Sequence, residues 1–153
     1  MSAPTPDLQV KLAVYRWFAE TGRRPSPEDV AERTGITPAD VLESYQHLRA
    51  QRVLVLDEDG ASIRMAPPFS GVQTQHAVMA AGVSYFANCA WDAFGIPAAL
   101  RSPATVQSRC ERSMEPLRLA IGLGGPEGEA AESGWLFHCA VPAAHWWDDI
   151  VFT

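Results

Sequence analysis

Cys89 and Asp92 are the two residues of this sequence whose types and spacing could carry out chemistry together. They lie in residues 85–100, which read YFANCAWDAFGIPAAL. We expect this segment to start as the end of a strand and to continue as a short helix from Asn88. Residues three apart share one face of a helix, so the Asp92 carboxyl would lie beside the Cys89 sulfur. Because the neighbouring side chains are nearly all apolar, the pair would be shielded from water.

Asn88 is predicted to be the N-cap of this helix, since its side chain can accept a hydrogen bond from a free backbone N–H group. Cys89 would then lie in the first turn, where the helix dipole favours a thiolate over a thiol. A structural alternative stays open. A cysteine on an apolar helix is usually a small buried hydrophobe, and an acid near a helix start often only complements the dipole.

The composition is that of a globular protein without an electrostatic preference for nucleic acid. The 153 residues, 47% hydrophobic and 20% charged, allow one domain or two small ones. The net charge of −6 gives no attraction for nucleic acid or for acidic membrane surfaces. No apolar run approaches the length of a membrane span, and the N-terminus lacks a signal pattern, so we expect a cytoplasmic protein. The three cysteines are widely spaced, which argues against a disulfide framework and a zinc knuckle.

Residues 7–66 predict three helices followed by a β-hairpin, which is the arrangement of a winged helix. Ser26 and Thr37 each precede a proline and, three residues on, an acid, so each is expected to start a helix. Strand signals follow in residues 52–56 and 61–65. We expect this part of the chain to be a packing module.

The same part of the chain lacks the charges of a DNA reader. The third predicted helix carries Asp40 and Glu43 near its start, where phosphate contacts would need lysine or arginine. Up to residue 70 there are eight basic and ten acidic residues. Binding of nucleic acid is therefore not expected.

The second half of the chain predicts a mixed β-sheet domain with the short helix of Cys89 and Asp92 inserted in it. Residues 66–71 are rich in proline and are predicted to be a linker, which divides the chain into domains 1–70 and 71–153. Residues 122–133 are predicted to be a loop. The expected strands are residues 74–79, 83–87, 104–109, 117–121, 135–141 and 146–152. The expected fold class is α+β.

Residues 85–100 resemble the active-site segment of organomercurial (alkylmercury) lyases, most specifically in Cys89-x-x-Asp92 and in Pro97-Ala98. The resemblance implies protonolysis of a carbon–mercury bond to a hydrocarbon and Hg(II), without an organic cofactor. It implies Cys89 as the thiolate ligand of the substrate's mercury and Asp92 as proton shuttle and general acid. Soft thiolates suit mercury, and burial raises a carboxyl pKa as proton donation requires.

Further expectations come with this family. Its N-terminal winged-helix-like domain does not read DNA, and Cys110 resembles a cysteine with a structural role. The substrate would be an alkyl- or arylmercury species arriving as a thiol adduct. The Hg(II) product would pass to acceptor thiols or a reductase.

The family's second catalytic cysteine would come directly after Thr153, where this sequence stops. We therefore expect a C-terminally incomplete chain, either a fragment or a reading frame ending at a UGA codon that is read as selenocysteine. Activity would then depend on the missing thiol. Cys139 is a candidate second mercury ligand, although a buried core cysteine is the more common outcome.

Two other functions remain open from the residues. The chain could be a winged-helix regulator that senses a soft metal through Cys89, or a protein that binds such a metal without catalysis. His138 and His145 are interpreted as ordinary strand-edge histidines, while Asp148 and Asp149 could bind a cation or a basic loop. Apolar edge strands near the C-terminus would favour homodimers.

Overall fold

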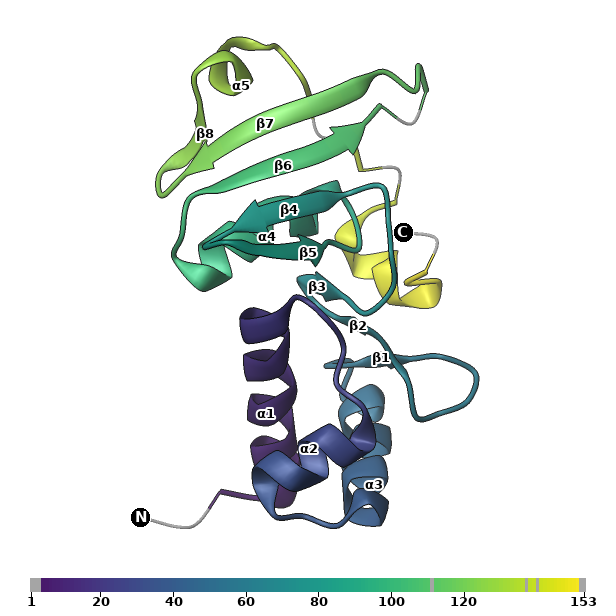
Figure 1. Ribbon diagram of the computed structural model, residues 1–153. Helices are drawn as coiled ribbons and strands as arrows, with labels where there is room; N and C mark the ends of the chain where they lie inside the picture. Colours follow the sequence, from purple (N-terminus) through teal and green to yellow (C-terminus); the bar gives the residue numbers. More distant parts are fainter. Residues whose placement is uncertain (1–3, 111, 137, 140, 152–153) are drawn as a thin grey trace.

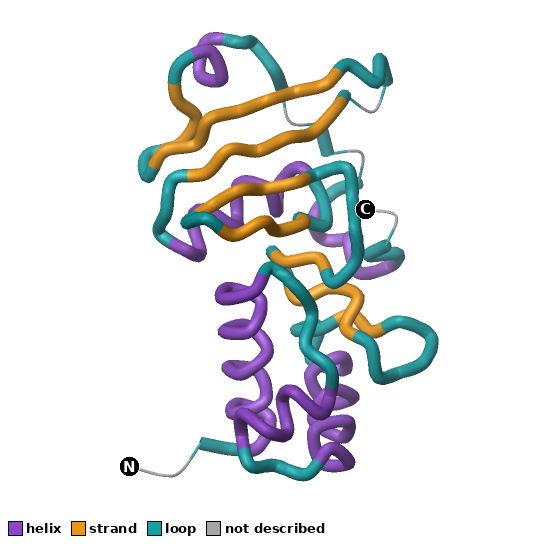
Figure 2. The backbone as a smooth tube through the Cα atoms, viewed as in Figure 1, coloured by secondary structure: helices purple, strands orange, loops and turns teal. Residues whose placement is uncertain are grey.

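The computed structural model describes residues 4–110, 112–136, 138–139 and 141–151. Three helices lie at one end of the molecule and a five-stranded sheet at the other, with a small three-stranded sheet between them (Figure 1). The backbone tube shows the same order of helix, small sheet and large sheet (Figure 2). The predicted α+β class, with a winged-helix-like arrangement before a sheet region, is confirmed. The division into domains 1–70 and 71–153 stays a prediction.

The three N-terminal helices begin and end where local signals place them. A threonine or serine side chain accepts a hydrogen bond from the first turn of each helix, and a proline follows it. Ser26 and Asp29 form a complete capping box. The helices are α1 (Pro6–Thr21), α2 (Pro27–Thr34) and α3 (Pro38–Ala50). On α3, the side chains of Val41, Tyr45 and Leu48 are buried in the core.

The small sheet contains the segment that was predicted to be a linker. Its strands β1 (Val55–Leu56), β2 (Ile63–Ala66) and β3 (Phe69–Ser70) pair antiparallel in that order. Ala66 pairs with Phe69 across the two prolines between them, so residues 66–71 turn back on themselves. The linker prediction is wrong because Phe69 is an apolar side chain that the core takes up.

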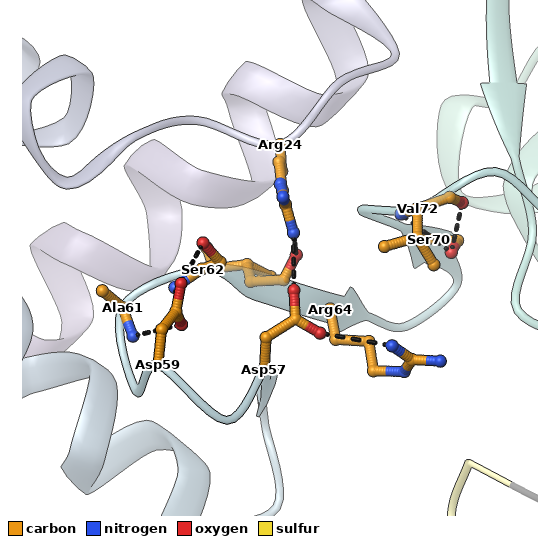
Figure 3. Close-up of polar contacts among 9 residues, drawn as sticks. Arg24, Asp57, Asp59, Ala61, Ser62, Arg64, Ser70 and Val72 are labelled. Atoms are coloured by element: carbon orange, nitrogen blue, oxygen red, sulfur yellow. Dashed lines mark hydrogen bonds and ion pairs between the residues drawn. The ribbon is translucent and has the colours of Figure 1, made fainter.

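Polar contacts order the hairpin that connects β1 to β2 (Figure 3). Asp57 accepts hydrogen bonds from Arg24 at 2.8 Å and from Arg64 at 3.2 Å. Asp59 accepts from Ser62 and from the backbone N–H of Ala61, and these bonds lower the pKa of Asp59 to about 2. The acidic tip of the hairpin is therefore a hydrogen-bonded turn.

The large sheet is antiparallel throughout the strands that the structure describes. Its order is β5-β4-β6-β7-β8, and Val78 pairs with Tyr85 on one side and with Val106 on the other. Helix α4 (Ala90–Leu100) packs against β4, β6 and β7. The strands are β4 (Ala77–Ala80), β5 (Val83–Phe86), β6 (Ala104–Arg109), β7 (Pro116–Gly122) and β8 (Gly125–Glu127).

The C-terminal part differs from the predicted structure. The predicted loop at 122–133 includes β8 and a short helix, α5 (Glu129–Glu132). The predicted strands at 135–141 and 146–152 are wrong for the described residues, which form irregular chain and a 3₁₀ helix, η1 (Ala143–Asp148). Within this segment the Trp146 indole donates to the Val141 carbonyl at 2.8 Å, and the Arg52 guanidinium lies 5.9 Å from the centroid of the Trp147 ring. Phe137, Ala140 and Phe152 lie outside the described residues.

Aromatic side chains join the helices to the large sheet. Phe69 stacks on Phe18 of α1 with ring centroids 5.5 Å apart, and lies 5.6 Å from Tyr85 of β5. The Tyr85 hydroxyl donates to the Ala19 carbonyl at 2.6 Å. These contacts form one continuous hydrophobic core from α1 to the sheet. In the described part of the chain, the helices all fall short of the length and apolarity that crossing a bilayer demands.

Candidate active site

Cys89 is the N-cap residue of α4. The helix therefore starts one residue later than predicted, because Asn88 was the expected N-cap. The backbone of Cys89 is extended, with φ −150° and ψ 178°, and its side chain caps no backbone N–H group. Asp92 lies in the first turn of the helix, as expected. The predicted N-cap, Asn88, precedes the helix because its side-chain amide is engaged elsewhere.

The Asn88 amide nitrogen makes two hydrogen bonds. It donates to the Asp92 carboxyl at 2.8 Å and to the Phe69 main-chain carbonyl at 3.2 Å. The four-residue spacing of Asn88 and Asp92, which allows side-chain hydrogen bonds along a helix face, was the sequence signal for this pair. This hydrogen bond was not predicted, because the Asn88 side chain was expected to cap the helix.

The thiol form of Cys89 is favoured over the thiolate, which corrects the expectation from the helix dipole. Burial of the half-buried side chain raises the pKa of Cys89, and the charge of Asp92 raises it further. The backbone N–H groups of Asp92 and Trp91 act in the opposite direction, as the dipole argument expects, but they are outweighed. At neutral pH the sulfur therefore carries a proton until a soft metal displaces it.

Burial also raises the pKa of Asp92, against the stabilising hydrogen bond from Asn88. A raised pKa is what a proton donor requires, because it increases the fraction of the Asp92 carboxyl that is protonated near neutral pH. A thiol and a carboxyl, both with raised pKa, thus lie within one helical turn.

Tyr15 is a site residue that the sequence analysis treated only as part of the first helix. Its ring meets Phe69 edge-on at 6.5 Å, and its hydroxyl donates to the Val53 carbonyl at 3.5 Å. Burial raises the pKa of Tyr15, and the charge of Asp92 adds to the effect. Helix α1 therefore brings the Tyr15 hydroxyl within electrostatic reach of Asp92. No local pattern indicates this, because the two residues lie 77 positions apart in the sequence.

Small residues let α4 approach the turn between β2 and β3. A side chain at Gly95 would place its Cβ 3.0 Å from Cβ of Pro68. Ala93 and Ile96 are buried on the same helix. Trp91 lies on the outer side with 59% of its surface exposed. The thiol and the carboxyl therefore sit at the edge of a tightly packed helix.

Cys139 is exposed, so the buried core position considered for it is wrong. Its sulfur donates to the Val141 carbonyl at 2.9 Å. Electrostatic interaction with Cys139 is also among the influences that raise the pKa of Cys89, which places the two sulfurs within electrostatic reach of each other. Of the three cysteines, the structure thus brings Cys139 towards Cys89, while Cys110 lies after β6 in the turn to β7.

The remaining candidates do not assemble into a metal site. His145 pairs with Asp148 at 3.0 Å within η1, and both side chains are exposed. His138 is exposed as well. Among the described residues, no three histidine, cysteine or acidic side chains lie together as ligands of a resident metal ion.

The fold and the site define a class: an α+β protein in which a thiol and a carboxyl share the start of a half-buried helix. Comparisons with family models and with solved structures place the chain among known proteins. The family model described as alkylmercury lyase matches residues 69–153, which is more than half of the chain. The chain belongs to the alkylmercury lyase family.

A second family model, Sigma-70 region 3, matches residues 8–60, the part that forms α1 to α3 and β1. The crystal structure of the mercury-bound form of MerB2 is similar in fold, with a TM-score of 0.66 and 20% sequence identity. The match covers 83% of this chain and 61% of that chain, so this chain spans about three-fifths of its length. The comparison with curated proteins finds no match.

Proposed function

We propose that this protein cleaves the carbon–mercury bond of organomercurials by protonolysis, giving a hydrocarbon and Hg(II). The observation that carries the proposal is the pair of Cys89 and Asp92 at the start of α4, with burial raising the pKa of both groups. Membership of the alkylmercury lyase family supports it. So does the fold shared with MerB2, whose structure was obtained in a mercury-bound form.

The first step is exchange of a thiol ligand on the substrate's mercury. The Cys89 sulfur binds mercury as it loses its proton, since soft thiolate is the preferred ligand of this soft metal. The nearby Asp92 carboxylate accepts that proton, while the bond between mercury and the original thiol ligand breaks and that ligand leaves as a thiolate. Cys89 thus brings to the site the proton that the reaction consumes.

The second step is proton delivery to carbon. The protonated Asp92 gives its proton to the mercury-bound carbon, and the electron pair of the breaking carbon–mercury bond stays with that carbon. The products are a hydrocarbon and Hg(II) held by Cys89, with Asp92 again ionised. Mercury keeps its oxidation state, so the reaction needs no redox cofactor.

Cys139 is proposed as a second thiol ligand of the Hg(II) product. Its exposed sulfur and its electrostatic influence on Cys89 support this role. Two-coordinate binding by thiolates would hold Hg(II) until acceptor thiols or a reductase remove it. The free cysteines of the described chain fit a reducing compartment such as the cytoplasm.

Product analysis tests the proposal. The purified chain is incubated with phenylmercury and excess thiol, and benzene and inorganic Hg(II) are measured together. We expect equimolar benzene and Hg(II) from the unmodified chain and none above background from Cys89→Ser. Asp92→Asn should bind phenylmercury but release benzene at least about a hundredfold more slowly, as expected when a general acid is removed. Benzene released at the normal rate by Cys89→Ser would refute the assignment.

Cys139→Ser separates the roles of the two thiols. We expect benzene release in the first turnover within about threefold of normal, because a product ligand acts after the bond breaks. Retention of Hg(II) by the protein after a desalting column should fall clearly. Cys110→Ser is the matched control and should leave both measurements unchanged.

A non-catalytic soft-metal protein would give a different result from the same assay. It would retain phenylmercury intact on Cys89 and release no benzene. The regulator hypothesis is disfavoured by the exposed acidic residues of α3, Asp40 and Glu43. A gel shift with upstream DNA, with and without Hg(II), should show no complex.

A further inference from the structure

The side chain of Asn88 ties the Asp92 carboxyl to the main chain of a different element. Its amide nitrogen donates to Asp92 at 2.8 Å and to the Phe69 carbonyl of β3 at 3.2 Å. Both partners are acceptors, so the two amide hydrogens must point at them and the orientation of the amide is fixed. The position of the carboxyl therefore depends on β3 as well as on its own helix.

The other end of the same amide has no partner. The Oδ1 atom of Asn88 is buried and accepts no hydrogen bond among the described residues. An asparagine that served as a helix cap would use this oxygen to accept from the first turn, but Cys89 holds the N-cap position. A buried acceptor without a partner destabilises a fold. The role of Asn88 is therefore that of a donor to Asp92.

We propose that Asn88 is a positioning residue that holds the Asp92 carboxyl in one orientation next to Cys89 by anchoring it to the Phe69 carbonyl. The proposal rests on the proposed function, in which Asp92 delivers the proton. Without the anchor, the half-buried carboxyl could rotate towards solvent. Proton transfer to carbon is sensitive to such misplacement, because a shift of about 1 Å can slow a reaction about a hundredfold.

Asn88→Ala and Asn88→Asp test the role of the donor. Asn88→Asp keeps the shape of the side chain but loses the amide hydrogens. We expect both variants to bind phenylmercury within about twofold of normal while first-turnover benzene release slows at least about tenfold. Asn88→Gln retains an amide and should recover part of the rate. Gln107→Ala, which removes an exposed amide from β6, is the control and should behave normally.

Normal rates in Asn88→Ala and Asn88→Asp, with benzene made by the unmodified chain, would overturn the positioning role alone. No benzene from the unmodified chain would overturn the proposed function, and the positioning role with it. Circular dichroism spectra must match, so that a folding defect is recognised.

A second measurement requires neither catalytic activity nor a substitution of Asn88. The side-chain amide protons of Asn88 are observed by NMR in the unmodified chain and in Asp92→Ala. We expect one of the two proton resonances to move upfield when its acceptor is removed, while the amide of Gln107 does not move. Unchanged Asn88 resonances would show that the hydrogen bond to Asp92 is not formed in solution, and would overturn the proposal.

Discussion

Helices α2 and α4 both start with a residue in extended conformation, but they use that position differently. At α2, the Ser26 hydroxyl accepts a hydrogen bond from the Asp29 backbone N–H, and the Asp29 carboxylate accepts from the backbone N–H and the hydroxyl of Ser26. At α4, Cys89 holds the same position and caps nothing. At the start of α2, the N–H groups of the first turn have side-chain acceptors, which stabilises the fold. At the start of α4, the N–H groups face the Cys89 sulfur, which is a weaker capping group than serine but can bind a metal.

The acids in the two first turns differ in the same way. Hydrogen bonds from Ser26 lower the pKa of Asp29, whereas burial raises the pKa of Asp92. Ionisation of Asp29 therefore favours the folded state and ionisation of Asp92 opposes it. The start of α4 is therefore less stabilised than the start of α2, and it holds a carboxyl that can carry a proton.

Cys89→Ser should give the largest effect and separate the two uses of a helix start. Hydrocarbon release should fall to the uncatalysed background, because an alcohol is a poor ligand for mercury. Serine is a good N-cap, so the free energy of unfolding should stay the same or rise by up to about 1 kcal/mol. Urea denaturation measures it. A fall in the free energy of unfolding by more than about 1 kcal/mol would show that better capping by serine does not determine the stability of this helix start.

Gly22→Ala and Gly35→Ala compare the ends of α1 and α2. Both glycines have positive φ, 69° and 73°. A side chain at Gly22 would collide with the Ser84 carbonyl of β5, whereas nothing lies near Gly35. We expect Gly22→Ala to lower the free energy of unfolding by about 3–4 kcal/mol and Gly35→Ala by about 1–1.5 kcal/mol.

Equal losses from these two substitutions would contradict the close docking of α1 on the sheet. Because Tyr15 reaches the site from α1, Gly22→Ala should also slow hydrocarbon release. Gly35→Ala should not, since α2 ends away from the site. Thermal unfolding and the benzene assay provide the two measurements.

Ser26→Ala removes the capping box and should have a smaller effect. We expect a loss of about 1 kcal/mol, equivalent to a melting temperature lower by about 2–4 °C. Hydrocarbon release per folded molecule should not change. A drop in that rate would mean that the start of α2 is coupled to the site.

The pH dependence of stability should show the opposite behaviour of Asp29 and Asp92. The pKa of Asp92 is higher in the folded than in the unfolded state, so its favourable contribution is complete in acid and is lost as pH rises through its folded pKa. Asp92→Asn should therefore gain stability relative to the unmodified chain as pH rises above about 4.

Asp29→Asn should show the reverse sign. The lowered pKa of Asp29 means that its contribution is present above its unfolded pKa and is lost as pH falls. The variant should be less stable than the unmodified chain at neutral pH and equal to it in acid. Urea denaturation between pH 3 and pH 7 measures both differences, and the same sign in both variants would contradict the comparison.

The helical part was predictable because its signals are local. Thr37 and Pro38 start α3, and Gly22 and Gly35 end α1 and α2, through bonds to residues a few positions away. Strands β6 and β7 were predicted closely for a similar reason, since an antiparallel pair joined by a short turn needs only its neighbour. The described residues of 135–141 and 146–152 do not form the expected strands, because apolar composition does not supply a partner strand.

The sequence by itself determined the three capped helices, the placement of Cys89 and Asp92 one turn apart, and the family to which they point. Hydrogen bonds and helical spacing over a few residues are sufficient for these. Only the tertiary structure decided that Tyr15 and Phe69 lie near the site, that Asn88 binds Asp92 instead of capping α4, and that the thiol form of Cys89 is favoured. The pKa values of Cys89 and Asp92 depend on burial by segments distant in the chain, and at both groups burial outweighs the hydrogen bonds from residues close in sequence.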